Sequence, residues 1–197
     1  MRSDALRNRQ RLLEAAERIF DEHGFEVPVG EIADAAEVGR ATLFRNFPAK
    51  HDLIAAVAVE VMTRWVHEAE ELLASSADED AELIFTFLKE MSGRQQTSRT
   101  LMEALTEEVL EHPDIRACHE TINAILAEAL RRGRAAGSVR PEIVPSDVII
   151  LIKGLCASVT LLGPDNHEVL DRHLDLIRAA ISAPSYARPL QAAPAML

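Results

Sequence analysis

The stretch VPVGEIADAAEVGRATLFRNFPAKHDLI, residues 27–54, decides the fold that we expect for this chain. Apolar residues mark a short helix directly after Pro28, because a proline is tolerated in the first turn of a helix. A second helix is predicted over Arg40–Phe47; Val38 and Gly39 join it to the first, and Pro48 ends it. Two short helices with a three- or four-residue turn form the helix-turn-helix arrangement.

The same stretch concentrates positive charge in an acidic chain. Arg40, Arg45 and Lys50 lie within residues 37–50, where Glu37 is the only acid. The whole chain of 197 residues has 21 Lys and Arg against 32 Asp and Glu, a formal net charge of -11. An acidic bulk argues against unspecific adhesion to nucleic acid but leaves room for one local basic face. We interpret the three cations as a face for a polyanion.

The remaining sequence predicts an all-α protein of about nine helices. Glycines are few and aromatic residues make up only 4% of the chain, which favours packed helices over sheets. Apolar residues recur at helical spacing in seven further segments, and no convincing strand is found. These helices are expected at about 4–23, 50–74, 83–91, 101–109, 115–130, 147–162 and 169–181.

Several classes of protein are disfavoured by what the sequence lacks. Cys118 and Cys156 are too few for a disulfide framework or a zinc site, so a reducing, cytoplasmic location is the simplest expectation. The N-terminal MRSDALRNRQ has no apolar signal region, and the apolar run at 148–163 is interrupted by Lys153. We find no phosphate-binding glycine loop, no His-Glu-x-x-His motif and no nucleophile elbow. No enzyme, cofactor, metal or membrane is therefore expected.

Residues 27–54 resemble the DNA-binding signature of the TetR family of bacterial transcriptional regulators. The match consists of Ile32-Ala33 in the first helix, Ala36-Glu37-Val38 at the turn, Thr42-Leu43-Phe44-Arg45-Asn46-Phe47 in the second helix, then Lys50 and Leu53. It covers about a quarter of the chain; AAGSVRPEIVPSDV, residues 135–148, is a weaker match to the loop before the family's dimerising helices.

The sequence departs from the family pattern at four positions. Glu37 replaces a usual glycine at a turn that favours a left-handed backbone, and Gly39 stands where a Ser or Thr commonly caps the recognition helix. Phe44 replaces a frequent Tyr and Asn46 a frequent His. These changes leave the phosphate contacts to Arg45, Asn46 and Lys50.

The resemblance implies which residues meet double-stranded DNA. Arg40 and Thr42 are the expected base readers, since Arg can grip guanine and Thr can meet a thymine methyl group. The remaining contacts are expected from Ala41, Phe44, Arg45, Asn46, Lys50, the backbone N–H of Val29, Arg7 and Arg11.

The resemblance also implies a division into domains: residues 1–50 bind DNA, residues 51–183 regulate and dimerise, and residues 184–197 form a loose tail. A homodimer on a palindromic operator, repressing until a small molecule binds, is the expected behaviour. The pocket is expected among Trp65, Phe85, Phe87, Met91, Met102, Leu105, His119, Ile122, Leu126 and Cys156. The dimer interface is expected at Leu151, Leu155, Val159, Leu162, Leu170, Leu174, Ile177 and Ile181, although intramolecular packing also explains such residues.

Two alternatives stay open. Cys118 and Cys156 are candidates for a thiol-responsive regulator, and Glu37 lends slight support to a dimeric interaction protein that no longer binds DNA.

Overall fold

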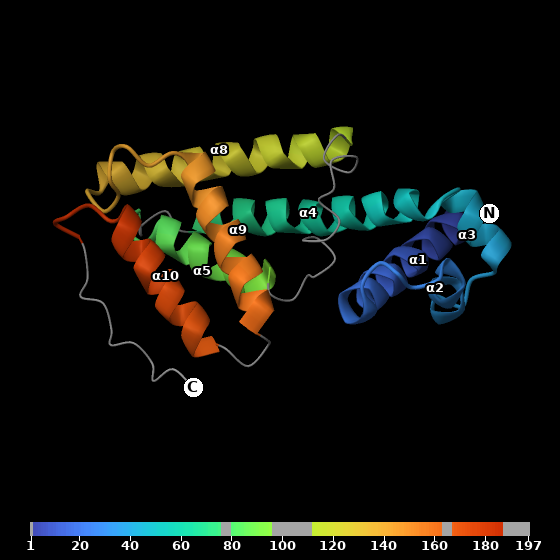
Figure 1. The fold of residues 1–197 in the computed structure, drawn as a ribbon. Coiled ribbons are helices and arrows are strands. Elements are labelled where there is room, and N and C mark those ends of the chain that lie inside the picture. The colour runs from blue at the N-terminus through green and yellow to red at the C-terminus, as the bar shows by residue number, and fades with distance from the viewer. Residues whose placement is uncertain (1, 76–79, 96–111, 163–166, 187–197) are drawn as a thin grey trace. The chain divides into compact units, whose positions relative to one another are not determined.

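The computed structural model describes residues 2–75, 80–95, 112–162 and 167–186 (Figure 1). Eight helices and no strand occur in these ranges, so the predicted all-α class is confirmed. The helix predicted at 101–109 and most of the tail predicted at 184–197 lie outside the described residues. Among the helices that are described, none combines the length and apolar character that crossing a bilayer requires.

The described chain divides into two compact units, which are treated separately. The first comprises residues 1–64 and 97–118. It contains α1 (Arg2–His23), α2 (Val29–Ala35), α3 (Arg40–Asn46) and the N-terminal part of α4 (Lys50–Ser75).

The core of the first unit is formed by one apolar stripe from each of its helices. α1 ends at Gly24, whose φ of 74° lets its N–H reach the carbonyl of Phe20 at 2.8 Å. Phe25 then folds back so that its ring meets the ring of Phe20 edge to face, with centroids 5.0 Å apart. The other buried members include Leu12, Leu13, Ala16, Ile32, Ala33, Leu43, Phe47, Leu53 and Val57.

The second unit comprises residues 65–96 and 119–197, of which the described part holds four helical segments besides the end of α4. These are α5 (Leu83–Gln95), most of α8 (Pro113–Ala135), α9 (Pro145–Leu162) and α10 (His167–Ile181). α9 packs on α5 and α10, and the shared core includes Leu83, Ile84, Leu88, Leu126, Leu130, Val148 and Ile181. The unit is therefore a layered helical body with one apolar core.

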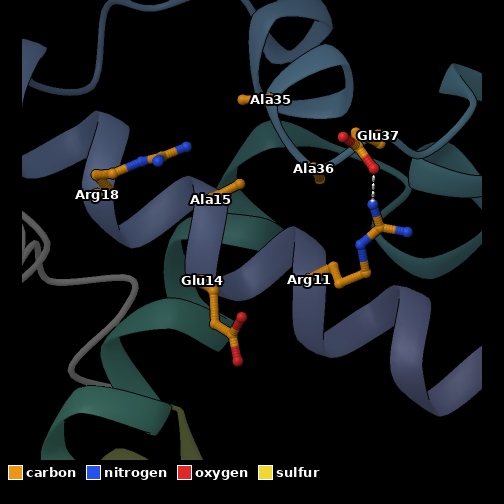
Figure 2. Close-up of a pocket in the computed structure, with 7 residues that line it drawn as sticks. All are labelled: Arg11, Glu14, Ala15, Arg18, Ala35, Ala36 and Glu37. Carbon is orange, nitrogen blue, oxygen red and sulfur yellow. Dashed lines mark hydrogen bonds and ion pairs between the residues drawn. The ribbon is translucent and has the colours of Figure 1, made fainter.

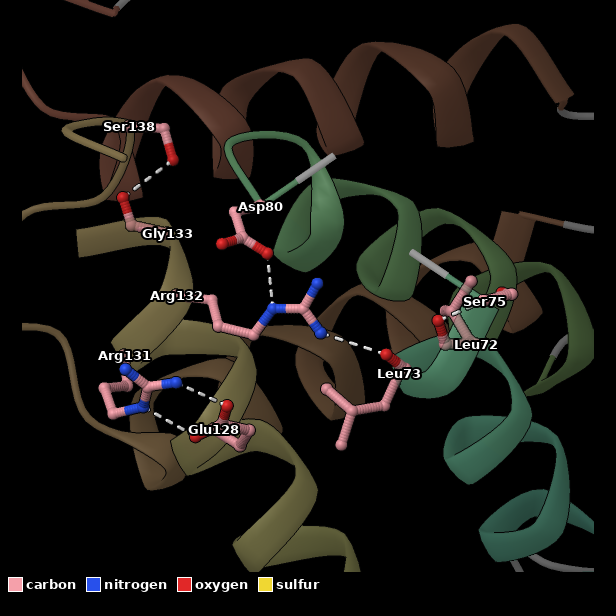
Figure 3. A network of polar contacts seen from close by, with 9 residues as sticks. All are labelled: Leu72, Leu73, Ser75, Asp80, Glu128, Arg131, Arg132, Gly133 and Ser138. Atoms are coloured by element: carbon pink, nitrogen blue, oxygen red, sulfur yellow. Dashed lines mark hydrogen bonds and ion pairs between the residues drawn. The ribbon is translucent and has the colours of Figure 1, made fainter. Parts of the chain in front are cut away.

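Charged side chains fasten the helix ends of this second unit (Figure 3). Arg132 of α8 donates to Asp80 at 2.5 Å and to the carbonyl of Leu73 in α4 at 3.0 Å. Arg178 of α10 grips Glu82 with two hydrogen bonds of 2.8 and 2.6 Å, and its guanidinium lies 4.0 Å from the centroid of the Phe85 ring. These links fix the start of α5 against α4, α8 and α10.

Candidate nucleic-acid interface

α3 is held by two buried residues on its inner side. Leu43 is 2% exposed and Phe47, directly after the helix, is 3% exposed. The helix starts at Gly39, whose carbonyl accepts from the N–H groups of Thr42 and Leu43 at 2.8 and 3.1 Å. Gly39 provides no side-chain cap, as its lack of a side chain requires. The motif thus anchors one side of α3 and leaves the other to solvent.

The outer side of α3 carries five of the ten predicted DNA contacts. Arg40, Ala41, Phe44 and Arg45 are exposed, and Thr42 is partly exposed. Phe44 is 49% exposed, so its ring is accessible to a ligand that approaches α3. The structure therefore brings these five residues together on one short exposed surface.

Two polar side chains of α3, those of Arg45 and Asn46, fold back along their own helix. Nε of Arg45 donates to the Ala41 carbonyl at 3.0 Å, and its Nη2 donates to Oγ1 of Thr42 at 3.2 Å. Nδ2 of Asn46 donates to the Thr42 carbonyl at 2.8 Å. These contacts limit the rotamers of both residues while Arg45 stays exposed, so its charge faces solvent in a defined place.

Arg40 lies across α2. Its Nη2 is 3.8 Å from Oδ2 of Asp34, and its side chain is 69% exposed. A Cβ on Gly30 would come within 2.8 Å of the same Nη2, so the guanidinium rests directly on the backbone of Gly30. Two residues of α2, Gly30 and Asp34, thus position the side chain of Arg40.

The turn between α2 and α3 has the hydrogen bonds of a Schellman motif. The N–H of Val38 reaches the Ala33 carbonyl at 2.9 Å, and the N–H of Glu37 reaches the Asp34 carbonyl at 3.1 Å. Glu37 has a φ of 53°, so the left-handed backbone expected at this position is confirmed. A non-glycine residue in that conformation costs about 1 kcal/mol.

The side chain of Glu37 forms an ion pair with α1. Oε2 of Glu37 lies 2.6 Å from Nη2 of Arg11 (Figure 2). The pair lies at one edge of a shallow groove of about 450 Å³ that Glu14, Ala15, Arg18, Ala35 and Ala36 also line. Arg11, predicted as a phosphate contact, is therefore engaged by a carboxylate.

Two of the other predicted contacts, Lys50 and Val29, lie at helix starts. Lys50 is the first residue of α4 and is partly exposed, and Val29 is the first residue of α2 and is partly buried. Asp52 accepts from the N–H of Ala49 at 2.8 Å, as the third residue of a helix does in a capping box. Arg7 on α1 is exposed and pairs with Asp4.

One cation near α3 was not predicted to have a role. The guanidinium of Arg9 lies 5.2 Å from the centroid of the Phe47 ring, which is a cation–π contact. Arg9 thereby covers the buried ring that ends α3. The helical periodicity of α1 gave no signal for this contact, because its partner lies 38 positions further along the chain.

Six of the predicted effector-pocket residues belong to the second unit's apolar core or pack against it: Trp65, Phe85, Phe87, Met91, Ile122 and Leu126. Phe85, Phe87, Met91 and Leu126 are buried, while Trp65, Ile122 and His119 are partly buried. Burial and the nearby charge of Lys153 lower the pKa of His119 below its usual 6.5. Met102 and Leu105, and the side chain of Cys156, lie outside the described residues.

The predicted dimer interface falls largely on residues that the chain buries by itself. Leu155, Leu170, Ile177 and Ile181 are between 1% and 9% exposed, so they offer little area to a partner. Leu151 and Leu174 are partly exposed, and the side chains of Val159 and Leu162 lie outside the described residues. Among the described side chains of α9 and α10, the large apolar residues that are exposed are Ile150, at 68%, and Leu176, at 37%, neither of which was predicted.

The described side chains include one free thiol and no group that could bind a metal ion. Cys118 is a free, partly exposed thiol whose Sγ lies 3.9 Å from Oγ1 of Thr63. Over the described ranges, no three His, Cys, Asp or Glu side chains are grouped to hold a metal ion.

Comparisons with known proteins agree with this geometry. Residues 12–57 match the family model "Bacterial regulatory proteins, tetR family", and residues 79–181 match "Transcriptional regulator SbtR-like, C-terminal domain". The chain belongs to the TetR family of bacterial transcriptional regulators. It is therefore a DNA-binding helix-turn-helix regulator, in a family whose members are typically repressors that respond to a ligand.

Individual relatives extend over nearly the whole chain. The probable HTH-type transcriptional regulator ArpR of Pseudomonas putida is 27% identical, over 90% of this chain and 94% of that protein. A TetR transcription regulatory protein from Mycobacterium vanbaalenii is 30% identical over 92% of this chain and 99% of its own, with a TM-score of 0.66. The TetR regulator SCO0520 from Streptomyces coelicolor is 26% identical over 89% and 99%, also with a TM-score of 0.66.

Proposed function

We propose that this chain is a homodimeric repressor that reads a palindromic operator with the exposed side of α3 and is released by a small molecule. The observation that carries the proposal is the division of α3 into a buried side and a cationic exposed side. Leu43 and Phe47 are almost fully buried, whereas Arg40, Phe44 and Arg45 face solvent. A helix presented in this way can enter a groove without disturbing its own core.

The dimensions of α3 support insertion into a major groove. Its seven residues span about 10 Å at 1.5 Å per residue, within the roughly 12 Å width of the groove in B-form DNA. Arg40 at its start is suited to guanine, and Thr42 to a thymine methyl group. Arg45 and Lys50 supply charge for phosphates, which position the protein without specifying sequence.

Dimerisation is proposed through the exposed apolar residues of α9 and α10. Ile150 is 68% exposed, and Gly154 lies one turn further along the same side of α9. A Cβ on Gly154 would meet no atom within 4 Å among the described residues outside its own helix turn, so the described fold does not require a glycine there. A second helix packed closely against α9 would explain both the exposure of Ile150 and the choice of glycine at residue 154. We propose that Leu176, 37% exposed on α10, contributes to the same contact.

An effector is proposed to bind within the second unit. Its core includes Ser92 of α5, which is fully buried and whose Oγ has no hydrogen-bond partner among the described residues. A buried hydroxyl without a partner is costly to the fold. A ligand with an acceptor or donor at this position would satisfy it, as the few polar groups of an apolar pocket commonly do. We therefore propose a small, largely apolar effector.

The proposal is tested by selecting duplexes from a random DNA library with the purified protein. The expected result is an inverted repeat, bound by a dimer, that also occurs upstream of the protein's own coding sequence. Half-sites related by two-fold symmetry and separated by one helical turn or a multiple of it are expected for a dimeric helix-turn-helix protein. Recovery of no preferred sequence at moderate salt would contradict the proposed function.

A further inference from the structure

The turn between α2 and α3 is built around a glutamate where the fold favours a glycine. The chain contains the same Schellman hydrogen bonds at the end of α8, and there the left-handed position is Gly137, with a φ of 74°. At the corresponding position after α2 stands Glu37, with a φ of 53°. The turn geometry thus does not require a glutamate, and the negative charge that Glu37 adds beside α3 has a consequence for DNA binding.

The ion pair that Glu37 forms contributes little to the stability of the fold. The carboxylate of Glu37 is paired with Arg11, but the two side chains are 83% and 44% exposed. Ion pairs this exposed contribute little to folding, because solvent screens them and ordering two long side chains is unfavourable. The pair is therefore better explained by what it does at the surface of the helix-turn-helix unit.

The position of Glu37 makes its charge important for DNA binding. Glu37 lies two residues before Gly39, the N-cap of α3, and three before Arg40. An unpaired carboxylate there would repel the phosphates that the cationic surface attracts. Arg11 places a positive charge 2.6 Å from this carboxylate and cancels it locally (Figure 2).

We propose that Arg11 acts in DNA binding as the counter-charge of Glu37 and is not a phosphate ligand. Arg11 is then a positioning residue: it holds the turn carboxylate against α1 and keeps the approach to α3 free of net negative charge. This inference rests on the proposed function, since it concerns the affinity of α3 for DNA.

A double-mutant cycle tests the proposal. Dissociation constants are measured by fluorescence anisotropy for a duplex selected by the unmodified protein, for Arg11→Ala, Glu37→Gly and both changes together. With Glu37 present, Arg11→Ala is expected to weaken binding about threefold, as for a charge at the rim of an interface. In the Glu37→Gly background the same change is expected to weaken binding by less than about 1.5-fold, since no carboxylate is left to neutralise.

If Arg11 instead binds a phosphate, the loss of affinity caused by Arg11→Ala should be larger without Glu37 than with it. Removal of Glu37 would release Arg11 toward the DNA, so Arg11→Ala would then cost more in the Glu37→Gly background than in the unmodified protein. That result, or an equal cost in both backgrounds, overturns the proposal. If the unmodified protein selects no duplex, the proposed function fails first and the inference fails with it.

Two control variants separate charge from backbone effects. Glu37→Gln removes the charge but keeps a side chain on the left-handed backbone, and it should suppress the effect of Arg11→Ala as fully as Glu37→Gly does. Arg18→Ala changes an exposed cation that lines the same groove on α1. Its effect should be the same with and without Glu37. A dependence of Arg18→Ala on Glu37 equal to that of Arg11→Ala would show a diffuse charge effect and overturn the pairing.

Discussion

The guanidinium of Arg40, the first residue of α3, lies on the backbone of Gly30 in α2. A Cβ at residue 30 would approach Nη2 and Cζ of Arg40 to 2.8 and 2.9 Å, and Asp34 lies 3.8 Å from the same Nη2. The side chain proposed to read a base is therefore positioned by the neighbouring helix before DNA arrives.

Gly30→Ala is expected to move Arg40 without harming the fold. The added methyl group meets only the flexible end of an exposed side chain, and Ala is favoured over Gly within a helix by up to about 1 kcal/mol. Urea unfolding should therefore show equal or higher stability, while the affinity for the selected duplex changes. In an Arg40→Ala background Gly30→Ala should leave DNA affinity unchanged; a persisting effect would mean that Gly30 acts on DNA binding by another route.

Lys50→Ala is expected to weaken binding to every duplex alike. A lost phosphate contact lowers the slope of log K against log salt by about 0.9 and carries no sequence information. Titrations at several salt concentrations measure this slope. Lys89→Ala, which removes an exposed cation from α5, is the matched control and should leave the slope unchanged. An unaltered slope for Lys50→Ala would remove Lys50 from the interface.

Ile150→Glu is expected to dissociate the dimer. It places a charge at the centre of the proposed contact between α9 helices, where an unpaired carboxylate would be desolvated. Analytical ultracentrifugation should show monomers at concentrations at which the unmodified protein is dimeric. Leu6→Glu is a matched control because Leu6 on α1 is also 68% exposed. A dimer that tolerates Ile150→Glu as well as Leu6→Glu would place the interface elsewhere.

Glu82→Ala is expected to destabilise the second unit by about 2–4 kcal/mol, because it leaves a largely buried charge without its partner. Arg178, only 16% exposed, donates two hydrogen bonds to Glu82, and the same contact raises the pKa of Arg178. Tyr186 also donates to Glu82, at 2.5 Å. Urea unfolding followed by circular dichroism measures the loss. Glu128→Ala, which removes the partner of exposed Arg131, should leave the stability almost unchanged because solvent screens that ion pair.

Local features of the DNA-binding unit could be predicted from the sequence. Short-range spacing and turn chemistry predict the start of α3, the burial of Leu43 and Phe47 and the left-handed backbone of Glu37; α3 ends at Asn46, one residue before its predicted end. Contacts between distant segments could not, because periodicity does not say which side chain meets which. The pairing of Arg11 with Glu37 spans 26 positions and left no pattern in the sequence.

The regulatory half shows a different limit. The helical spacing of apolar residues on α9 and α10 predicted that one face of each helix is buried. Spacing alone does not show whether such a face packs into the chain's own core or against a second copy. Leu155 and Ile177 were assigned to a partner and are buried within the chain, while Ile150 was passed over and is exposed. Only the packing of α9 on α5 and α10 distinguishes these cases.

The most direct test of the central claim is methylation interference on the selected duplex. Dimethyl sulfate modifies guanine N7 in the major groove, the atom that an Arg40 contact needs. We expect interference at one guanine in each half-site, two-fold related, and its loss at those guanines alone in Arg40→Ala. Interference that is absent from the major groove, or identical in Arg40→Ala and the unmodified protein, would contradict the reading of DNA by α3.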